Sequence, residues 1–113
     1  MTDTSQHELF EPEETCPPAP IPEGAIWREL TIVNKKGLHA RATAKFVQCT
    51  ESFTADMTVT RCGETVGGNS IMGILTLGAG QGSTITVTAK GEDAQAALDA
   101  IQALVAARFG ESE

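Results

Sequence analysis

Two segments of this chain alternate between apolar and polar side chains, and that alternation limits the possible folds more than any other feature. Within residues 53–60 and 83–89, apolar residues recur at every second position, and threonine fills most of the positions between them. Such a period of two predicts β-strands that bury one side and expose the other. The apolar residues are Phe53, Ala55, Met57 and Val59, then Ile85, Val87 and Ala89. The chain is therefore expected to form a sheet with one covered face and one threonine-rich face in water.

Helical spacing of apolar residues predicts three helices between and after these strands. The first covers Ala40–Glu51, and a short second helix begins at Ile71 and stops at Gly78. The last helix opens after Gly91-Glu92-Asp93, where the acids suit the positive end of a helix. Its expected buried stripe consists of Ala94, Ala97, Leu98, Ile101, Leu104, Val105 and Phe109.

Two more strands complete the predicted order. Glu29–Val33 is the first, and Glu64–Val66 returns after a hairpin turn at Arg61-Cys62-Gly63. The order becomes β-α-β-β-α-β-α, which is typical of a two-layer α+β fold with helices on one face of the sheet.

Charge and proline divide the chain into two parts. All five prolines lie in the first 22 residues, and residues 1–26 carry six acidic side chains and no Lys or Arg. A segment with few large apolar side chains cannot offset the entropy cost of ordering. We therefore predict a flexible, acidic, proline-rich tail over residues 1–26 and one folded domain over 27–113. The acidic balance also argues against nucleic acid as a partner.

The cysteines and histidines are expected to form neither disulfides nor a zinc site. Three cysteines, Cys16, Cys49 and Cys62, form an odd set without metal-site spacing, which predicts reduced thiols. Two histidines cannot form a typical zinc site, so no such site is expected. The sequence shows neither a secretory signal nor an apolar run of membrane-spanning length. We expect a cytoplasmic protein without membrane contact.

The segment Gly37-Leu38-His39-Ala40-Arg41 carries the candidate chemistry. His39 precedes a predicted helix, whose first amides are unpaired and whose partial positive charge favours an anion. A neutral imidazole is a competent nucleophile towards a phosphoryl group, and the Arg41 guanidinium suits phosphate oxygens. The alternative is that His39 is a surface residue that merely caps the helix.

Residues 28–113 resemble HPr, the histidine-containing phosphocarrier of the phosphoenolpyruvate-dependent phosphotransferase system. The matching motifs are Asn34-Lys35-Lys36-Gly37-Leu38-His39-Ala40-Arg41, Ala44-Lys45-Phe46-Val47 and Asn69-Ser70-Ile71-Met72-Gly73-Ile74-Leu75-Thr76-Leu77-Gly78. The resemblance implies a two-layer open-faced sandwich with a four-stranded antiparallel sheet and three helices on one face. It also implies a carrier that needs no metal or organic cofactor and is a substrate-like relay more than an independent enzyme. A monomer is the default expectation for the oligomeric state.

Residue roles follow from the same resemblance. His39 is expected to accept phosphate from enzyme I through Nδ1, Arg41 to screen the phosphohistidine, and an enzyme IIA-type protein to be the next acceptor. Ala42 stands where the family often has proline, as in the branch whose phosphotransferase chain is mainly regulatory. Proline there would pre-set φ but supply no functional group, so its loss leaves the chemistry intact.

Ser70 is the second candidate site. Its simplest role is to cap the short helix, a role for which Asn69 is the alternative. In some relatives the serine of this motif is phosphorylated by HPr kinase/phosphorylase. A phosphate there would add about two negative charges near the docking face. We expect it to weaken phosphate transfer by repelling enzyme I.

A small, flat patch around His39 is the expected docking surface. Its members are Ala40, Ala44 and Gln48 on the first helix and Ile71 and Met72 on the second, with core packing as the alternative for Ile71. Two rival functions remain. One is a regulatory module that acts through Ser70 without relaying phosphate. The other, a nucleic-acid-binding domain, lacks the basic patch and stacking aromatics it would need.

Overall fold

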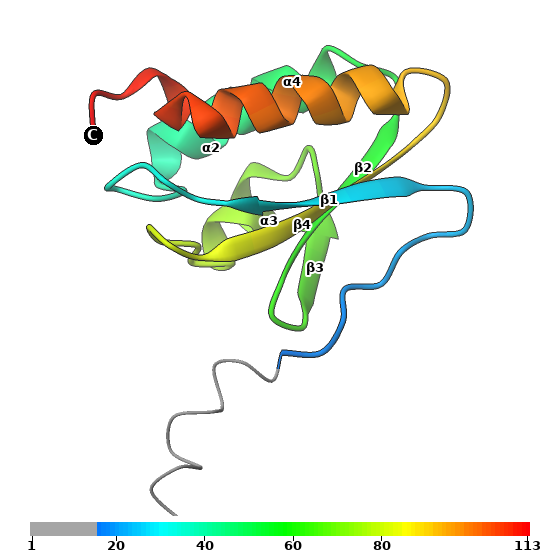
Figure 1. Ribbon diagram of the computed structural model, residues 1–113, viewed down its shortest axis with the longest axis horizontal. Coiled ribbons are helices and arrows are strands. Elements are labelled where there is room, and N and C mark those ends of the chain that lie inside the picture. Colours follow the sequence, from blue (N-terminus) through cyan, green and yellow to red (C-terminus); the bar gives the residue numbers. More distant parts are fainter. Residues whose placement is uncertain (1–15) are drawn as a thin grey trace, which may run out of the picture.

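An antiparallel sheet of four strands organises residues 16–113, which are the residues that the computed structural model describes. The elements follow in the order β1 (Ile26–Thr31), α2 (Ala40–Glu51), β2 (Asp56–Arg61), β3 (Glu64–Gly67), α3 (Ile71–Thr76), β4 (Thr84–Lys90), α4 (Ala94–Ala106) and a 3₁₀ turn at Arg108–Gly110. In space the strands are ordered β1-β4-β2-β3. The α2 and α4 helices lie on one side of the sheet (Figure 1), and α3 packs against α2 and β3. The predicted fold class is confirmed.

Strand register places the apolar residues on the helix-facing side. Val59 of β2 is paired with Val87 of β4 and with Val66 of β3, and Leu30 of β1 is paired with Ile85. Side chains of directly paired residues point to the same face of a sheet. The alternation in the sequence therefore becomes a continuous apolar layer under the helices.

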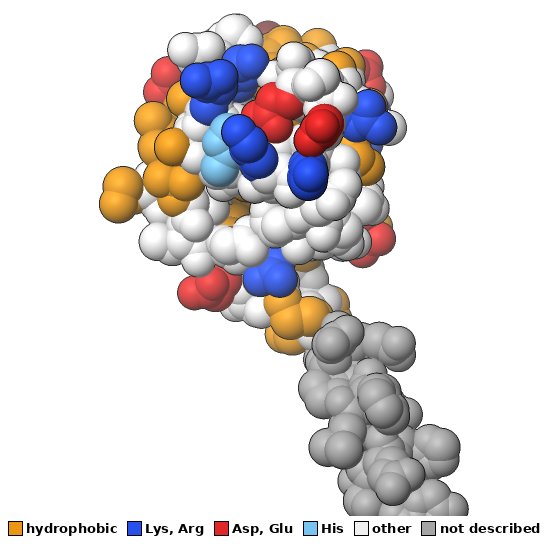
Figure 2. All heavy atoms as spheres, turned by 90° about the vertical axis from the view of Figure 1, so that its left-hand side faces the viewer, with side chains coloured by type: hydrophobic (Ala, Val, Ile, Leu, Met, Phe, Trp, Pro, Cys, Tyr) orange, Lys and Arg blue, Asp and Glu red, His pale blue; other side chains and the backbone are white. Residues whose placement is uncertain are grey.

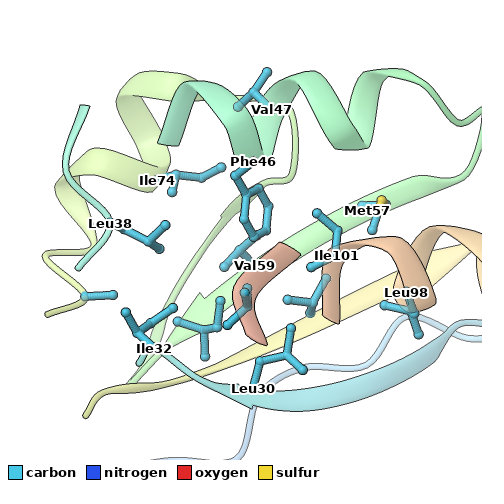
Figure 3. Packing of buried hydrophobic residues seen from close by; sticks show 14 of the residues in the cluster. Leu30, Ile32, Leu38, Phe46, Val47, Met57, Val59, Ile74, Leu98 and Ile101 are labelled. Atoms are coloured by element: carbon cyan, nitrogen blue, oxygen red, sulfur yellow. The ribbon is translucent and has the colours of Figure 1, made fainter. Parts of the chain in front are cut away.

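The core lies between this layer and the helices (Figure 3). Phe46 of α2, Ile74 of α3 and Ile101 of α4 are completely buried and converge on Val59. Among residues 16–113, two aromatic rings are fully buried, those of Phe46 and Phe109. Aliphatic side chains thus supply most of the burial that stabilises the domain.

The threonine-rich face is less wet than the sequence indicates. Thr60 and Thr88 are 2% and 1% exposed. The hydroxyls of Thr58 and Thr88 lie 2.5 Å apart across β2 and β4, and that of Thr60 lies 2.7 Å from Thr65. Hydroxyl groups bonded to one another across strands do not need water. The expectation of a fully solvated face is wrong for these residues.

The first alternating segment enters the sheet later than predicted. Phe53 and Ala55 precede β2, which begins at Asp56. The backbone N–H of Thr54 donates to the Asp93 carboxylate at 2.8 Å, in place of a bond to a neighbouring strand. Phe53 still packs against the core from this connection.

The cysteine prediction is wrong for two of the three residues. Cys16 and Cys62 form a disulfide, and Cys49 is the free cysteine of the described chain. The bond joins residues 46 positions apart, which is why spacing did not reveal it. It attaches part of the predicted tail, residues 16–25, to the β2–β3 hairpin. Residues 1–15 of that tail lie outside the described part.

Among the helices of residues 16–113, none is long and apolar enough to cross a membrane.

Candidate functional site

His39 occupies the N-cap position of α2 in extended conformation, with φ −78° and ψ −177°. Its carbonyl accepts the first helical hydrogen bond, from Thr43 N–H at 2.8 Å, but its ring forms no capping bond. The first amides of an α-helix have no acceptor within the helix and point along its axis. The imidazole therefore stands beside an anion-binding helix end without being used to cap it.

Gly37, two residues before His39, determines the backbone conformation of the loop that leads into α2. Its φ is +69°, and a Cβ there would lie 2.6 Å from the carbonyl oxygen of Ala79 and 2.7 Å from Gly80 Cα. The next residue, Leu38, donates its N–H to the same Ala79 oxygen at 2.9 Å. Only glycine fits between these backbones. The motif glycine thus docks the loop before α2 onto the loop after α3.

The His39 ring is bonded to a residue near the end of the chain. Its Nε2 lies 2.5 Å from Oε2 of Glu111, and the side chains are 30% and 18% exposed. Hydrogen bonds from His39 and then from Asn34 hold the pKa of the Glu111 carboxyl below its ordinary value, and Lys36 contributes to the same direction. Glu111 is therefore a carboxylate at neutral pH and accepts a hydrogen from Nε2.

Asn34 connects the two halves of the site. It is fully buried, and its amide group donates to Glu111 Oε1 at 3.0 Å and to the Gly37 carbonyl at 2.9 Å. Its own Oδ1 is buried without a hydrogen-bond partner among the described residues. A buried polar atom without a partner costs free energy, so the two hydrogen bonds that the NH₂ group donates must offset that cost. Asn34 fixes both the glycine turn and the carboxylate that faces His39.

A strained turn brings Glu111 to this position. Arg108 and Phe109 have φ values of +58° and +56°, which non-glycine residues rarely adopt. The Phe109 ring is buried, and its carbonyl accepts a hydrogen bond from Lys45 Nζ of α2 at 2.7 Å. Burial and this bond offset the strain, which would otherwise straighten the turn.

Glu111 and Asn34 were not identified as site residues from the sequence. Glu111 lies 72 positions from His39, and no local pattern links the two. The left-handed residues that redirect the chain, Arg108 and Phe109, are not residue types that signal such a turn.

A shallow depression of about 550 Å³ surrounds the ring. It is lined by Lys35, Lys36, His39, Ala40, Arg41, Glu111, Ser112 and Glu113. In Figure 2 the histidine (pale blue) lies at the surface between basic side chains (blue) and a group of hydrophobic ones (orange). Arg41 is exposed and its side chain forms no hydrogen bond or ion pair within residues 16–113, so its guanidinium is available to an incoming anion. In the same residues no group of three or more metal-binding side chains comes together.

Ser70 lies at the N-cap of α3, as predicted. Its Oγ accepts the Gly73 N–H at 3.0 Å, and the residue is partly buried. The expected capping role is confirmed, with Ser70 rather than Asn69 as the cap.

The predicted docking patch is exposed at its apolar end. Met72 is 71% and Ile71 is 43% exposed, so the core alternative is wrong for Ile71. Ala40 and Gln48 are also exposed and Ala44 partly so, all on α2, which packs against α3. The five residues thus lie on two adjacent helices, with Ala40 directly after His39.

Comparison with known proteins gives a family match over most of the folded part. The family model described as "PTS HPr component phosphorylation site" matches residues 26–107. The phosphocarrier protein HPr of Cupriavidus necator is 50% identical over 88 residues, which are 78% of this chain and 99% of that protein. The phosphocarrier protein NPr of Shewanella violacea is 47% identical over 75% of this chain and 93% of its own.

Solved structures show the same architecture. A crystal structure of HPr from Thermoanaerobacter tengcongensis superposes with a TM-score of 0.75 at 38% identity, covering 78% of this chain and 99% of that one. Another structure of HPr from this organism is of a dimer. The expectation that the present chain is a monomer therefore stays a prediction.

Proposed function

Since this chain belongs to the HPr family and is a phosphocarrier of the phosphotransferase system, we propose that His39 is the residue that carries the phosphate. In this proposal enzyme I donates the phosphoryl group and an enzyme IIA-type protein receives it. The observation that supports it most directly is the geometry of His39. Its ring lies at the N-terminus of α2, free of any capping role and beside the unengaged Arg41.

Glu111 decides which nitrogen acts. By accepting the hydrogen of Nε2, the carboxylate stabilises the tautomer whose lone pair is on Nδ1. That lone pair attacks phosphorus, an N–P bond forms, and the bond between phosphorus and the donor breaks. Proton transfer from Nδ1 is not needed. The second transfer reverses these bond changes on the acceptor, so the carrier returns to its starting state.

The surroundings match a phosphate that must be held and then released. Helix amides and Arg41 stabilise the phosphoryl oxygens, whereas Glu111 adds a negative charge on the opposite side of the ring. The depression is shallow and the docking patch small, which suits partners that bind briefly.

Incubation with enzyme I and phosphoenolpyruvate tests the proposal. Wild-type protein should gain one acid-labile, base-stable phosphate, and His39→Ala should gain none. His7→Ala is the matched control, since His7 is the only other histidine of the chain, and it should be labelled like wild type. Full labelling of His39→Ala, or an unlabelled wild type, would contradict the proposal.

We also propose that phosphorylation of Ser70 regulates this transfer, by an enzyme of the HPr kinase/phosphorylase type. The Ser70 hydroxyl already accepts one helix amide, and a phosphate could keep that bond while it adds charge at the start of α3, two residues before the exposed Met72. Docking would weaken, but the fold would stay. Ser70→Asp should therefore raise the KM of enzyme I for this carrier without lowering its melting temperature, and Thr76→Asp on the same helix is the control. An unchanged KM for Ser70→Asp would refute the regulatory role while leaving His39 transfer intact.

A further inference from the structure

Cys62 stands in a turn position for which folding alone gives no reason to choose cysteine. Arg61 and Glu64 pair at the end of the hairpin, and the two residues between them, Cys62 and Gly63, have φ values of +44° and +90°. Two-residue turns of this form favour Asn, Asp or Gly, because other residues meet steric resistance there. The strained cysteine at the hairpin tip is bonded to Cys16.

The disulfide attaches a segment that the domain does not need for its core. All buried hydrophobic side chains of residues 16–113 lie from Leu30 to Phe109, and the family match begins at residue 26. Residues 16–25 contain no helix or strand and leave β1 on the side of the sheet opposite the helices (Figure 1). At the disulfide end, a Cβ added to Gly63 would lie 3.5 Å from Pro17. The bond is therefore a tether for an added segment and not a staple of the fold.

Accessibility separates the two bonded cysteines from the third. Cys16 and Cys62 are both exposed residues, and exposure favours attack by a dissolved thiol. Cys49 is partly buried, and burial raises the pKa of its thiol, so little reactive thiolate forms at neutral pH. Exchange should therefore be confined to the pair at the hairpin.

We propose that the Cys16–Cys62 disulfide is a thiol–disulfide exchange site through which a dithiol reductant releases residues 16–25 from the β2–β3 hairpin. A thiolate of the reductant attacks one sulfur, which forms a mixed disulfide and frees the other cysteine. The second thiol of the reductant then displaces the remaining cysteine. Two electrons pass to the protein, two protons end on Cys16 and Cys62, and the reductant leaves as its own disulfide. Glutathione disulfide, as the oxidant, restores the tether: one cysteine thiolate attacks it and one glutathione leaves, and the other cysteine then displaces the second glutathione from the mixed disulfide.

Trp27 provides a signal for the release. It is the only tryptophan of the chain, it is 51% exposed, and it lies at the start of β1, where the tethered segment ends. Its neighbour Arg28 bonds Asp99 and Gln102 of α4, so Arg28 faces the helices and Trp27 faces the open side of the sheet. The segment leaves β1 on that same side, and its release changes the surroundings of the indole.

The experiment equilibrates the full chain in glutathione buffers from reducing to oxidising, then quenches and alkylates it. Mass analysis should show Cys16 and Cys62 changing together in a single two-electron transition, with Cys49 reduced throughout. Reduction should raise hydrogen exchange at the Ala25 amide, which donates to the Pro22 carbonyl within the tethered segment, and should change Trp27 fluorescence. The melting temperature should fall by no more than about 10 °C, because release gives the segment added freedom in the folded state as well as in the unfolded chain.

Three variants make the result decisive. Cys49→Ser should behave like wild type. Cys16→Ser and Cys62→Asn should show the released state in every buffer, and Asn at position 62 suits the turn, so the hairpin persists. A chain that forms no Cys16–Cys62 bond in any buffer would overturn the proposal. So would identical exchange and fluorescence in the bonded and reduced forms.

Discussion

The helices α2 and α3 both begin with a polar N-cap residue, but the two N-cap side chains form different hydrogen bonds. Each has a polar N-cap residue in extended conformation, His39 for α2 and Ser70 for α3. Ser70 turns its hydroxyl inward and accepts the amide of Gly73. His39 leaves the amides of its helix alone and bonds Glu111, which arrives from the other end of the chain.

This difference separates a structural residue from a chemical one. A side chain that caps its own helix is already engaged in a hydrogen bond. Modifying it changes the surface charge more than the reactivity of the site. A side chain oriented by a distant carboxylate keeps one nitrogen and several helix amides available. The site thus lies at the helix whose N-cap side chain forms no capping bond. The C-terminal turn, through Glu111, orients the His39 ring instead.

Substituting the glycine beside each helix start gives the largest expected contrast. Gly37→Ala places a methyl group against the Ala79 carbonyl and forces a positive φ on alanine, so we expect a loss of about 3 kcal/mol. Gly73→Ala would place a Cβ 2.8 Å from Ser70 Oγ and 2.9 Å from Val66 Cβ, but Val66 lies on the edge strand β3, which can shift, and alanine favours helix. That loss should be about 1 kcal/mol. Urea denaturation measures both, and equal losses would refute the rigid docking of the Gly37 loop.

Removing the Arg41 guanidinium tests the chemical role of the site at the start of α2. Arg41→Ala should reduce the rate of phosphate acceptance by roughly 30-fold, because a charge-assisted hydrogen bond to phosphate contributes about 2 kcal/mol. Stability should not change, since the side chain bonds nothing else in residues 16–113. Lys35→Ala, which removes the same charge from the same depression, is the control. If both variants slow the reaction equally, overall charge and not the position of the guanidinium is responsible.

Deleting the two N-cap side chains should affect stability unequally. Ser70→Ala removes a cap and should cost about 1 kcal/mol. His39→Ala removes no capping bond, and the thermal midpoint should drop less than for Ser70→Ala. Calorimetry of the two variants decides the point. A larger drop for His39→Ala would mean that the Glu111 contact stabilises the fold more than a helix cap does.

The smallest expected effect concerns pH. The pKa of Glu111 is lowered in the folded protein, so its contribution to stability is present above its ordinary value of 4.5. The contribution is lost as pH falls from there through the lower folded value. Glu111→Gln should therefore show a flatter decline of stability below about pH 4.5 than wild type. Denaturant midpoints measured from pH 3 to pH 7 check this, with Glu113→Gln as the control, and parallel curves would contradict it.

Much of the fold could be predicted because its signals are local. Ala40–Glu51 was predicted to the residue, since the helix begins after an extended His39 and the apolar spacing is regular. The strand over Thr84–Lys90 was predicted within one residue at each end for the same kind of reason. The start of β2 was missed because Asp93, far along the chain, takes the N–H of Thr54.

The sequence by itself determined that helices cover one face of a sheet and that a helix begins directly after His39. It also determined the positions of the turns at Gly37 and at Cys62-Gly63. Periodicity and turn chemistry depend on neighbours within a few positions, so they can be read along the chain. Tertiary structure alone decided that Glu111 and Asn34 orient His39, and that Cys16 meets Cys62. Those contacts join residues 46 to 77 positions apart. Only closure of the α4 helix onto the sheet, and of the hairpin onto the N-terminal segment, brings them together.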